Sequence, residues 1–253
     1  MKIIETLGCA QSPVLYMLHG WGVHSALLKP LAEQLSADYQ VHLLDLPGHG
    51  FNQNQQLSAD LTACAQLADD FEPGIWLGWS LGGMLAMNLA LNKPHLVQKL
   101  VLLCATPCFT QKEHWPHGVE SSVLDQFGER IQEDIKQTIR RFLQLEVLGS
   151  GDEKDQLKKI TQQVFQAPLP DIVSLQAGLQ LLRHADLSLS LKNLQMPSLW
   201  LTGRRDRMVR PAAVQMASEY SQGKYQMIRG AGHAPFIHHS DELTEIIREF
   251  LCH

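Results

Sequence analysis

The residues best suited to chemistry are a serine and its glycine neighbours, in the stretch Gly78 to Gly82. This G-x-S-x-G pattern follows a short apolar run at residues 75–78 and precedes a helical pattern at residues 84–91, so Ser80 is expected on a sharp turn between strand and helix. Glycines on both sides of such a turn let the strand and the helix approach each other closely. This position between strand and helix predicts that the Ser80 hydroxyl is a nucleophile.

A serine needs a general base to react at neutral pH, and the base needs an acid to orient it. His233 lies on a glycine-rich loop after a late strand pattern, and Asp206 follows the strand pattern at residues 198–202. Taken alone, a loop aspartate is usually a solvated turn residue and a loop histidine a surface group. The order Ser80, Asp206, His233 is that of α/β-hydrolases, however, and it predicts that the three form a catalytic triad.

The loop at residues 19–21 follows the first long strand pattern and could supply hydrogen-bond donors. We expect the backbone amides of Trp21 and Leu81 to form an oxyanion hole, in which each donor is worth about 3 to 4 kcal/mol. His19 is expected to brace this loop. The turn at residues 45–50 is interpreted as scaffold, with a catalytic His49 as the minority alternative.

Two kinds of apolar pattern alternate along the chain and must position these residues. Runs typical of buried strands occupy residues 14–18, 41–45, 75–78, 99–103, 198–202 and 224–228. Apolar residues at helical spacing occupy residues 26–35, 57–70, 84–91 and 242–251. This alternation predicts an α/β fold with a mostly parallel sheet flanked by helices.

The alternation stops between about residue 110 and residue 186. Helical spacing continues there at residues 121–148, 153–165 and 172–182, with breaks at Gly149, Gly151, Pro168 and Pro170. We therefore expect one core, formed by residues 1–109 and 187–253, and an inserted helical lid at residues 110–186.

Length, composition and charge limit the function. The 253 residues are 45% hydrophobic and 19% charged, which is enough for a large core and excludes wholesale disorder. A net charge of −5 argues against a general nucleic-acid binder. Neither a membrane span nor an export signal is recognisable, and five scattered cysteines without a C-x-x-C pair are typical of reduced thiols. We expect a cytoplasmic monomer that requires neither a metal nor an organic cofactor.

Over essentially its whole length the chain resembles the α/β-hydrolase superfamily, in the motifs described above. More specifically, it is similar to the pimeloyl-[acyl-carrier protein] methyl ester esterases of biotin synthesis in five stretches, at residues 18–22, 75–83, 107–109, 141–145 and 233–236. That resemblance implies a carboxylesterase that cleaves the methyl ester of a carrier-bound pimeloyl chain through an acyl-enzyme. The substrate would also be the transient protein partner.

The resemblance also implies binding residues. Substrate contacts would come from Trp21, Ser80, Leu81, Phe142, Leu143, Gln144, Leu145, Glu146 and His233. Basic lid residues of the family meet the acidic carrier, and the matching positions here are Gln137, Arg141, Lys154 and Lys158. Glutamine replaces one arginine of the family and lysine replaces two, while glutamate stands at position 146 where the family tends to have glutamine. Residues 129–159 hold seven basic and seven acidic side chains, so these charges could equally be the solvated face of a lid helix.

Two alternatives remain. The first is another serine hydrolase of this fold, such as a small-ester esterase, a thioesterase or a carbon–carbon bond hydrolase. The second is a binding protein that keeps the hydrolase fold without turnover. The serine at position 80 disfavours a dehalogenase or an epoxide hydrolase, which use an aspartate nucleophile.

Overall fold

Seven strands form a single sheet in the computed structural model, which describes residues 1–148 and 153–252. The strand order is β1-β3-β2-β4-β5-β6-β7, and every neighbouring pair is parallel except β1 with β3. The strands are β1 (Lys2–Leu7), β2 (Val14–Leu18), β3 (Gln40–Asp45), β4 (Gly74–Trp79), β5 (Val97–Leu103), β6 (Ser198–Gly203) and β7 (Lys224–Ile228). The predicted α/β fold with a mostly parallel sheet is confirmed.

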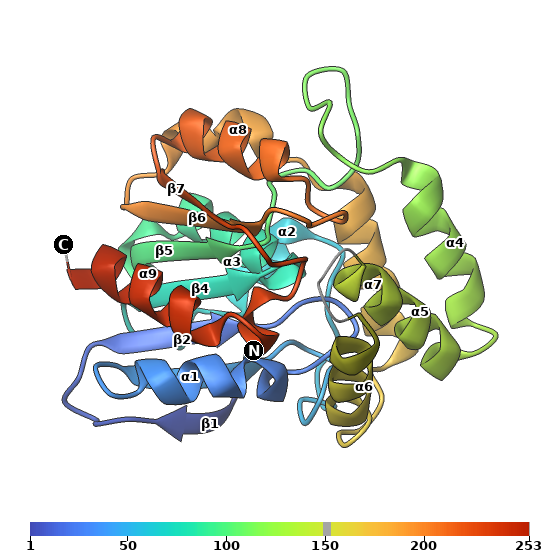
Figure 1. The fold of residues 1–253 in the computed structure, drawn as a ribbon, viewed down its shortest axis with the longest axis horizontal. Coiled ribbons are helices and arrows are strands. Elements are labelled where there is room, and N and C mark those ends of the chain that lie inside the picture. The colour runs from blue at the N-terminus through green and yellow to red at the C-terminus, as the bar shows by residue number, and fades with distance from the viewer. Residues whose placement is uncertain (149–152, 253) are drawn as a thin grey trace.

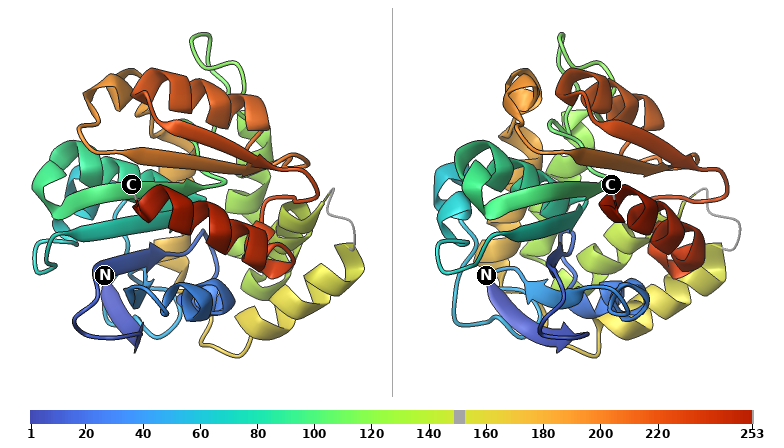
Figure 2. Two further views of the ribbon diagram at one scale, coloured as in Figure 1. Left: turned by 60° about the vertical axis from the view of Figure 1, so that its left-hand side comes forward. Right: turned by 90° about the vertical axis from the view of Figure 1, so that its left-hand side faces the viewer.

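Helices cover both faces of the sheet, as Figures 1 and 2 show. Side chains alternate between the faces along each strand: Leu15 and Met17 of β2 pack with the α1 and α9 helices, whereas Tyr16 and Leu18 pack on the other face. Because both faces are covered, every residue of the central strand β4 is buried. The flanking helices are α1 (Lys29–Leu35) and α9 (Ser240–Cys252) on one face, and α2 (Leu61–Gln66), α3 (Leu81–Asn92) and α8 (Pro211–Ser221) on the other.

Among the described residues, four α-helices lie between β5 and β6 in the chain, beyond the carboxyl ends of the central strands (Figure 1). They are α4 (Ser121–Ile131), α5 (Ile135–Val147), α6 (Glu153–Val164) and α7 (Ile172–His184). The Asp134 carboxylate caps α5 by accepting a hydrogen bond from the Gln137 amide, which explains why the apolar pattern at residues 121–148 divides into two helices. The predicted breaks at Gly149 and Gly151 lie outside the described residues.

Two elements were not predicted, and one was predicted too long. β1 pairs antiparallel with β3 at the edge of the sheet, and its half-exposed side chains give no continuous apolar run. α8 was missed as well. The helix expected over residues 57–70 is α2 alone, because the Asp60 side chain accepts a hydrogen bond from the Thr62 amide and begins the helix there. None of the described helices has both the length and the apolar character needed to cross a membrane.

Candidate active site

Ser80 occupies the turn between β4 and α3 with an unusual backbone conformation. Its φ of 56° and ψ of −119° lie in a region that L-residues rarely adopt, so the turn holds local strain. The surrounding glycines are required by contact: a Cβ atom on Gly78 would lie 2.4 Å from the carbonyl oxygen of Gly82. The Ser80 carbonyl accepts hydrogen bonds from the Gly83 and Met84 amides and starts α3. The turn therefore fixes the serine at the carboxyl end of the central strand.

Ser80, His233 and Asp206 form one hydrogen-bonded chain. His233 Nε2 lies 3.0 Å from Ser80 Oγ, and His233 Nδ1 lies 2.8 Å from Asp206 Oδ2. The second carboxylate oxygen of Asp206 accepts hydrogen bonds from the Met208 and Val209 amides at 2.9 Å and 2.8 Å. All three side chains are buried. With Nδ1–H donating to the carboxylate, Nε2 is free to accept the serine proton.

The backbone of His233 is held from the core and from the inserted helices. Trp79 Nε1 donates to the His233 carbonyl oxygen at 2.8 Å, and the His233 amide donates to the carbonyl oxygen of Glu146 at 3.3 Å. Burial by itself lowers the pKa of His233, but the charge and hydrogen bond of Asp206 outweigh burial, so the pKa lies above its ordinary 6.5. A base with this pKa is suited to proton transfer near neutral pH.

Glu146 reaches the triad from α5. Neither of its carboxylate oxygens has a hydrogen-bond partner among the described residues, and the side chain is fully buried. Burial raises the pKa of Glu146 to about 8, with His233 opposing the shift and Asp206 adding to it. The side chain is therefore a neutral acid at pH 7. Sequence reasoning expected a substrate contact at this position, and the structure puts a buried carboxyl near the imidazole.

The loop at residues 19–21 lies against the turn that carries Ser80. A Cβ atom on Gly20 would lie 3.3 Å from the Ser80 Cβ, and one on Gly82 would lie 2.5 Å from the His19 carbonyl oxygen. Neither Trp21 nor Leu81, the first residue of α3, donates its backbone amide in the turn, loop and cap hydrogen bonds of the described residues. Both amides thus belong to segments that meet at the serine.

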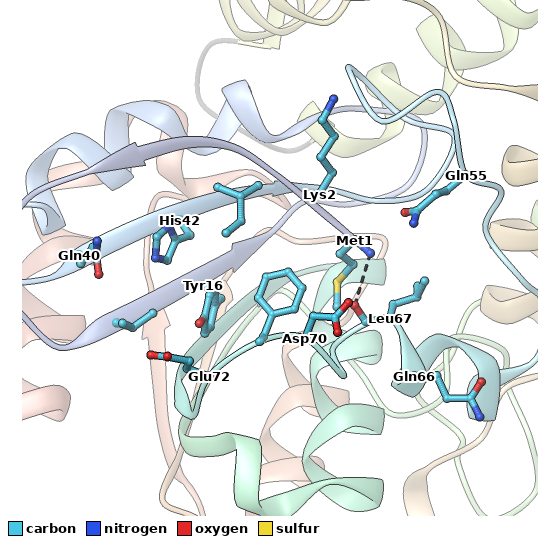
Figure 3. A pocket seen from close by; sticks show the side chains of 13 residues that line it. Met1, Lys2, Tyr16, Gln40, His42, Gln55, Gln66, Leu67, Asp70 and Glu72 are labelled. Carbon is cyan, nitrogen blue, oxygen red and sulfur yellow. Dashed lines mark hydrogen bonds between the residues drawn. The ribbon is translucent and has the colours of Figure 1, made fainter. Parts of the chain in front are cut away.

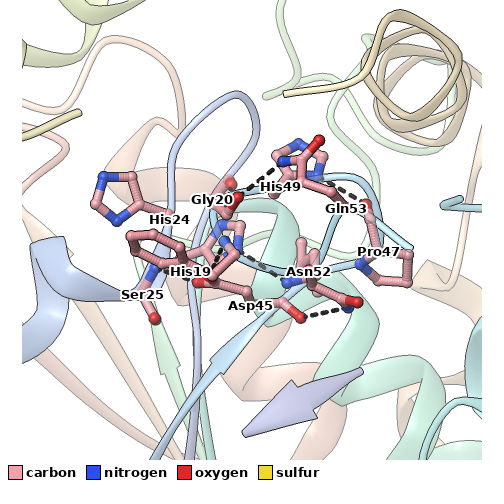
Figure 4. Close-up of polar contacts among 12 residues, drawn as sticks. His19, Gly20, His24, Ser25, Asp45, Pro47, His49, Asn52 and Gln53 are labelled. Atoms are coloured by element: carbon pink, nitrogen blue, oxygen red, sulfur yellow. Dashed lines mark hydrogen bonds and ion pairs between the residues drawn. The ribbon is translucent and has the colours of Figure 1, made fainter. Parts of the chain in front are cut away.

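His19 has the bracing contacts that we predicted. Its Nε2 accepts a hydrogen bond from the Leu46 amide at 3.0 Å, and its Nδ1 donates to the Gly20 carbonyl oxygen at 2.7 Å (Figure 4). Burial lowers the pKa of His19 to about 3, although nearby Asp45 opposes the shift. The neutral ring ties the loop after β2 to the loop after β3.

The turn after β3 is held by the Asp45 side chain, although the buried His49 Nε2 has no hydrogen-bond partner among the described residues. The two carboxylate oxygens of Asp45 accept hydrogen bonds from the Ser25 and Phe51 amides, each at 2.8 Å (Figure 4). His49 is buried, and its Nδ1 bonds to the Pro47 carbonyl oxygen at 2.9 Å. These contacts agree with a scaffold role for the turn.

Phe142 and Leu143, two of the predicted substrate contacts on α5, lie in different environments. The Phe142 ring packs on Trp21 with centroids 4.6 Å apart, and Phe127 of α4 contacts both rings. Trp21 Nε1 donates to the Leu175 carbonyl oxygen at 2.8 Å, which ties the loop after β2 to α7. Leu143 is instead buried in the cluster on the α1 and α9 face of the sheet. Phe142 is thus placed beside the loop after β2, and Leu143 is a packing residue.

Gln144 and Leu145 line a groove between α4 and α5 with a volume of about 470 Å³. Its other walls are Val123, Gln126, Phe127, Arg130, Arg141 and Leu148. Phe127 lines the groove and also contacts Trp21, so a single aromatic side chain joins the groove to the loop after β2. The groove combines apolar walls with two guanidinium groups, which suits a chain that has an apolar body and an anionic end.

Lys154 and Lys158 are exposed on α6 and do not line this groove. Acidic residues accompany them. Lys159 forms an ion pair with Asp155 at 2.6 Å, and the positive charge of Lys158 also acts on Asp155. The structure therefore separates Arg141 from the two lysines that sequence reasoning grouped with it.

A cavity of about 640 Å³ lies at the β1 edge of the sheet (Figure 3). Its walls come from β1, β2, β3 and residues 66–72, and include Tyr16, His42, Asp70 and Glu72. The Met1 amine donates to the Leu67 carbonyl oxygen at its edge. None of the predicted site residues lines this cavity.

One cluster has the residue types of a metal site. Among the described residues, only Cys104, Asp206 and His233 form such a group, with one potential ligand atom from each within 4.8 Å of the others. Burial raises the pKa of the Cys104 thiol well above its ordinary range, so the sulfur is protonated and a poor ligand. Asp206 and His233 already bond to each other. The donor set suits a proton relay better than a metal ion.

Comparison with known proteins agrees with this geometry. The family of the alpha/beta hydrolase fold matches residues 13–240, so the chain belongs to that family. An esterase from Exiguobacterium antarcticum has the same fold, with a TM-score of 0.87 and 21% identity over 98% of this chain and 94% of its own. A bromoperoxidase from Bacillus anthracis also has it, with a TM-score of 0.85 and 18% identity over 98% and 94% of the two chains.

Closer relatives define the branch of that family. The pimeloyl-[acyl-carrier protein] methyl ester esterase of Xylella fastidiosa is 40% identical over 253 residues, which cover 98% of each chain. Its counterpart in Xanthomonas oryzae pv. oryzae is 38% identical over 251 residues, again covering 98% of each. The chain belongs to the family of pimeloyl-[acyl-carrier protein] methyl ester esterases.

Proposed function

We propose that the protein hydrolyses the methyl ester of pimeloyl-[acyl-carrier protein], giving the free carboxylate and methanol, as a step of biotin synthesis in the cytoplasm. The hydrogen-bonded chain Ser80–His233–Asp206 carries the proposal. Its substrate follows from the family, since the relatives above take this ester according to their names. We further propose that the enzyme acts as a monomer, with residues 110–186 as a lid over the core.

The triad would act as a nucleophile, a base and an orienting acid. Ser80 Oγ attacks the ester carbonyl while His233 Nε2 accepts its proton, and the Asp206 carboxylate stabilises the imidazolium that forms. His233 then gives the proton to the leaving methoxide, so methanol departs and an acyl-serine remains. Water attacks the acyl-serine with His233 as base again, which releases the carboxylate and restores the serine.

The Trp21 and Leu81 amides would hold the oxyanion of both tetrahedral intermediates. They belong to two segments in contact at Ser80, and the strained turn sets the position of Leu81. Donors fixed before the reaction need no reorganisation, which is why such sites stabilise transition states strongly. Phe142 and Trp21 would provide apolar walls for the methyl-capped end of the chain, because that end carries no charge for water to solvate.

Substrate comparison tests the proposal. Purified enzyme is given pimeloyl-[acyl-carrier protein] methyl ester, p-nitrophenyl butyrate and an acyl thioester, with the Ser80→Ala variant as the matched control. We expect kcat/KM to be highest for the carrier ester. A clear preference for p-nitrophenyl butyrate or the thioester would instead support a small-ester esterase or a thioesterase.

Rescue of a host that lacks its own esterase and requires biotin gives a second test. The wild-type gene should restore growth without biotin, and the Ser80→Ala gene should not. Rescue by both genes, or by neither when the protein is well expressed, would contradict the role in biotin synthesis. A fluorophosphonate that fails to label Ser80 in the folded wild type would revive the non-catalytic alternative.

A further inference from the structure

Glu146 is the one buried side chain of the described residues that leaves two polar atoms without hydrogen-bond partners. It is fully buried, and burial raises its pKa to about 8, so the carboxyl is protonated at neutral pH. A protonated carboxyl still offers its hydroxyl as a donor and its carbonyl oxygen as an acceptor. Burying such a group without partners is unfavourable, and a reactant that arrives during catalysis would supply the missing partner.

Two stripes of side chains on α5 face different parts of the molecule. Leu143 and Val147, four residues apart, are buried in the cluster on the α1 and α9 face of the sheet. Phe142 and Glu146 form the neighbouring stripe at the same spacing, and Phe142 packs on Trp21 in the other cluster. The stripe that carries Glu146 therefore faces the loop after β2, which lies against the turn between β4 and α3.

Glu146 also lies close to the base and the acid of the triad. The His233 amide donates to the Glu146 carbonyl oxygen at 3.3 Å, and electrostatic interactions link the Glu146 carboxyl to His233 and to Asp206. The polar atoms of those two side chains are already bonded, since one Asp206 oxygen accepts from His233 and the other from two backbone amides. Among these three side chains, only Glu146 has oxygens without a partner.

The reactants of an acyl-serine esterase differ in the partners that they need. The ester carbonyl oxygen would be held by the Trp21 and Leu81 amides, and a methylene chain forms no hydrogen bonds. The hydrolytic water must donate one O–H to His233 Nε2 and direct a lone pair at the acyl carbon, so its second O–H needs an acceptor. Ser80 and His233 are only 2% and 1% exposed, so bulk solvent does not provide that acceptor here.

We propose that Glu146 is a further catalytic residue that binds the hydrolytic water during deacylation, with a carboxyl oxygen accepting the second O–H of that water. This inference rests on the acyl-enzyme mechanism of the proposed function. The water oxygen attacks the acyl carbon while its first proton passes to His233 Nε2. The tetrahedral intermediate then breaks its bond to Ser80 Oγ, which takes that proton from His233, and the acid product leaves.

Methanol distinguishes this role from a general effect on the triad. By the reverse of acylation it can attack the same acyl-serine, but its only O–H goes to His233 Nε2 and a methyl group stands in place of the second O–H. An acceptor at Glu146 therefore speeds attack by water and leaves attack by methanol unaffected. Loss of that acceptor should show as a change in how the acyl group divides between the two nucleophiles.

The test measures this division at neutral pH. Wild type, Glu146→Gln and Glu146→Met are given p-nitrophenyl butyrate in buffer with added methanol, and butyric acid and methyl butyrate are quantified. Glutamine keeps a carbonyl acceptor and methionine removes it at similar length, while both are uncharged like the protonated glutamate. We expect the ratio of methyl butyrate to butyric acid to rise about tenfold in Glu146→Met and to stay within about twofold of wild type in Glu146→Gln.

Controls separate this role from folding and from the proposed function. The product ratio does not depend on how much enzyme is folded, and fluorophosphonate labelling reports the attack by Ser80 alone. The inference is overturned if Glu146→Met divides the acyl group as wild type does, or if its labelling slows as much as its hydrolysis, which would make Glu146 a structural contact of the His233 loop. A wild type that is not labelled at Ser80 would refute the serine mechanism itself. The expected ratios without turnover of pimeloyl-[acyl-carrier protein] methyl ester would refute only the proposed substrate.

Discussion

Two buried histidines, each just after a strand of the sheet, show how the same residue types acquire different chemistry. His19 follows β2 near Asp45, and His233 follows β7 near Asp206. Both rings are buried, yet the pKa of His19 is lowered to about 3 while that of His233 is raised. The fold alone therefore does not decide which histidine can act as a base.

Their hydrogen-bond partners make the difference. Both ring nitrogens of His19 are bonded to backbone groups, and the Asp45 carboxylate lies 3.9 Å from the ring and accepts from two backbone amides instead. In His233, Nδ1 is hydrogen-bonded to the Asp206 carboxylate and Nε2 to the Ser80 hydroxyl. A carboxylate in direct contact stabilises the imidazolium, whereas backbone partners only fix the neutral ring. The arrangement around His233 can therefore move a proton, whereas the arrangement around His19 can only hold two loops together.

The largest effect should come from removing the Ser80 hydroxyl, the partner that His233 has and His19 lacks. Ser80→Ala removes the nucleophile and should lower kcat about 10⁶-fold, while the fold is retained because alanine is smaller than the serine it replaces. Turnover of p-nitrophenyl butyrate and the melting temperature measure the two effects. Appreciable activity in the purified variant would refute the assignment of the nucleophile.

Asp206→Asn should have the next largest effect. The asparagine Oδ1 can keep the hydrogen bonds from the Met208 and Val209 amides, but its NH₂ group donates to Nδ1 and forces the ring proton onto Nε2. That nitrogen can then no longer accept the serine proton. We expect kcat to fall by about four orders of magnitude with little loss of stability.

Asp45→Asn is the matched control in the other cluster. It changes the same residue type near a buried histidine, but the two carboxylate oxygens of Asp45 accept from two different backbone amides, and asparagine offers only one oxygen. It should therefore lower the melting temperature with a far smaller loss of kcat. The reverse pattern, with the larger kcat loss in Asp45→Asn, would mean that His19 rather than His233 is the base.

Glu146 is a buried acid near His233 that has no counterpart beside His19. Its titration should be visible in the pH dependence of the free energy of unfolding. Its pKa is raised from 4.5 to about 8, so the folded protein holds a proton that the unfolded chain releases in this range. The contribution of Glu146 to stability is therefore present below about pH 4.5 and is lost as pH rises through about 8. Glu146→Gln should remove about 4 kcal/mol of the decline in the free energy of unfolding across this range.

Urea unfolding at several pH values measures that decline, with Glu129→Gln as the control at an exposed carboxyl of α4. If wild type and Glu146→Gln lose stability in parallel from pH 5 to pH 8, Glu146 does not hold its proton in the folded state. The variant also restores the residue type that the resemblance led us to expect at this position.

The sequence predicted those features whose structure depends on residues close together in the chain. The serine turn, the central strands and the chain order of Ser80, Asp206 and His233 could be read in advance, because buried strands need apolar runs and the turn needs glycine. β1 could not, since an exposed edge strand needs no such run. The environment of Glu146 depends on how distant segments pack, and no spacing within one segment encodes that packing.

The smallest expected effect concerns pH and separates the two histidines directly. His19→Ala leaves the buried Leu46 amide without its acceptor and should cost about 1 to 3 kcal/mol of stability. Any loss of turnover should be the same at every pH, because His19 is already neutral throughout the working range.

Activity falls in acid when His233 gains a proton and can no longer act as base, so kcat/KM should rise with pH through a midpoint above 6.5 in wild type and variant alike. The rate at which a fluorophosphonate labels Ser80, followed from pH 5 to pH 9, gives this midpoint. A midpoint that moves in His19→Ala would show that the His19 ring titrates. The contrast between backbone-bonded and carboxylate-bonded histidines would then be wrong.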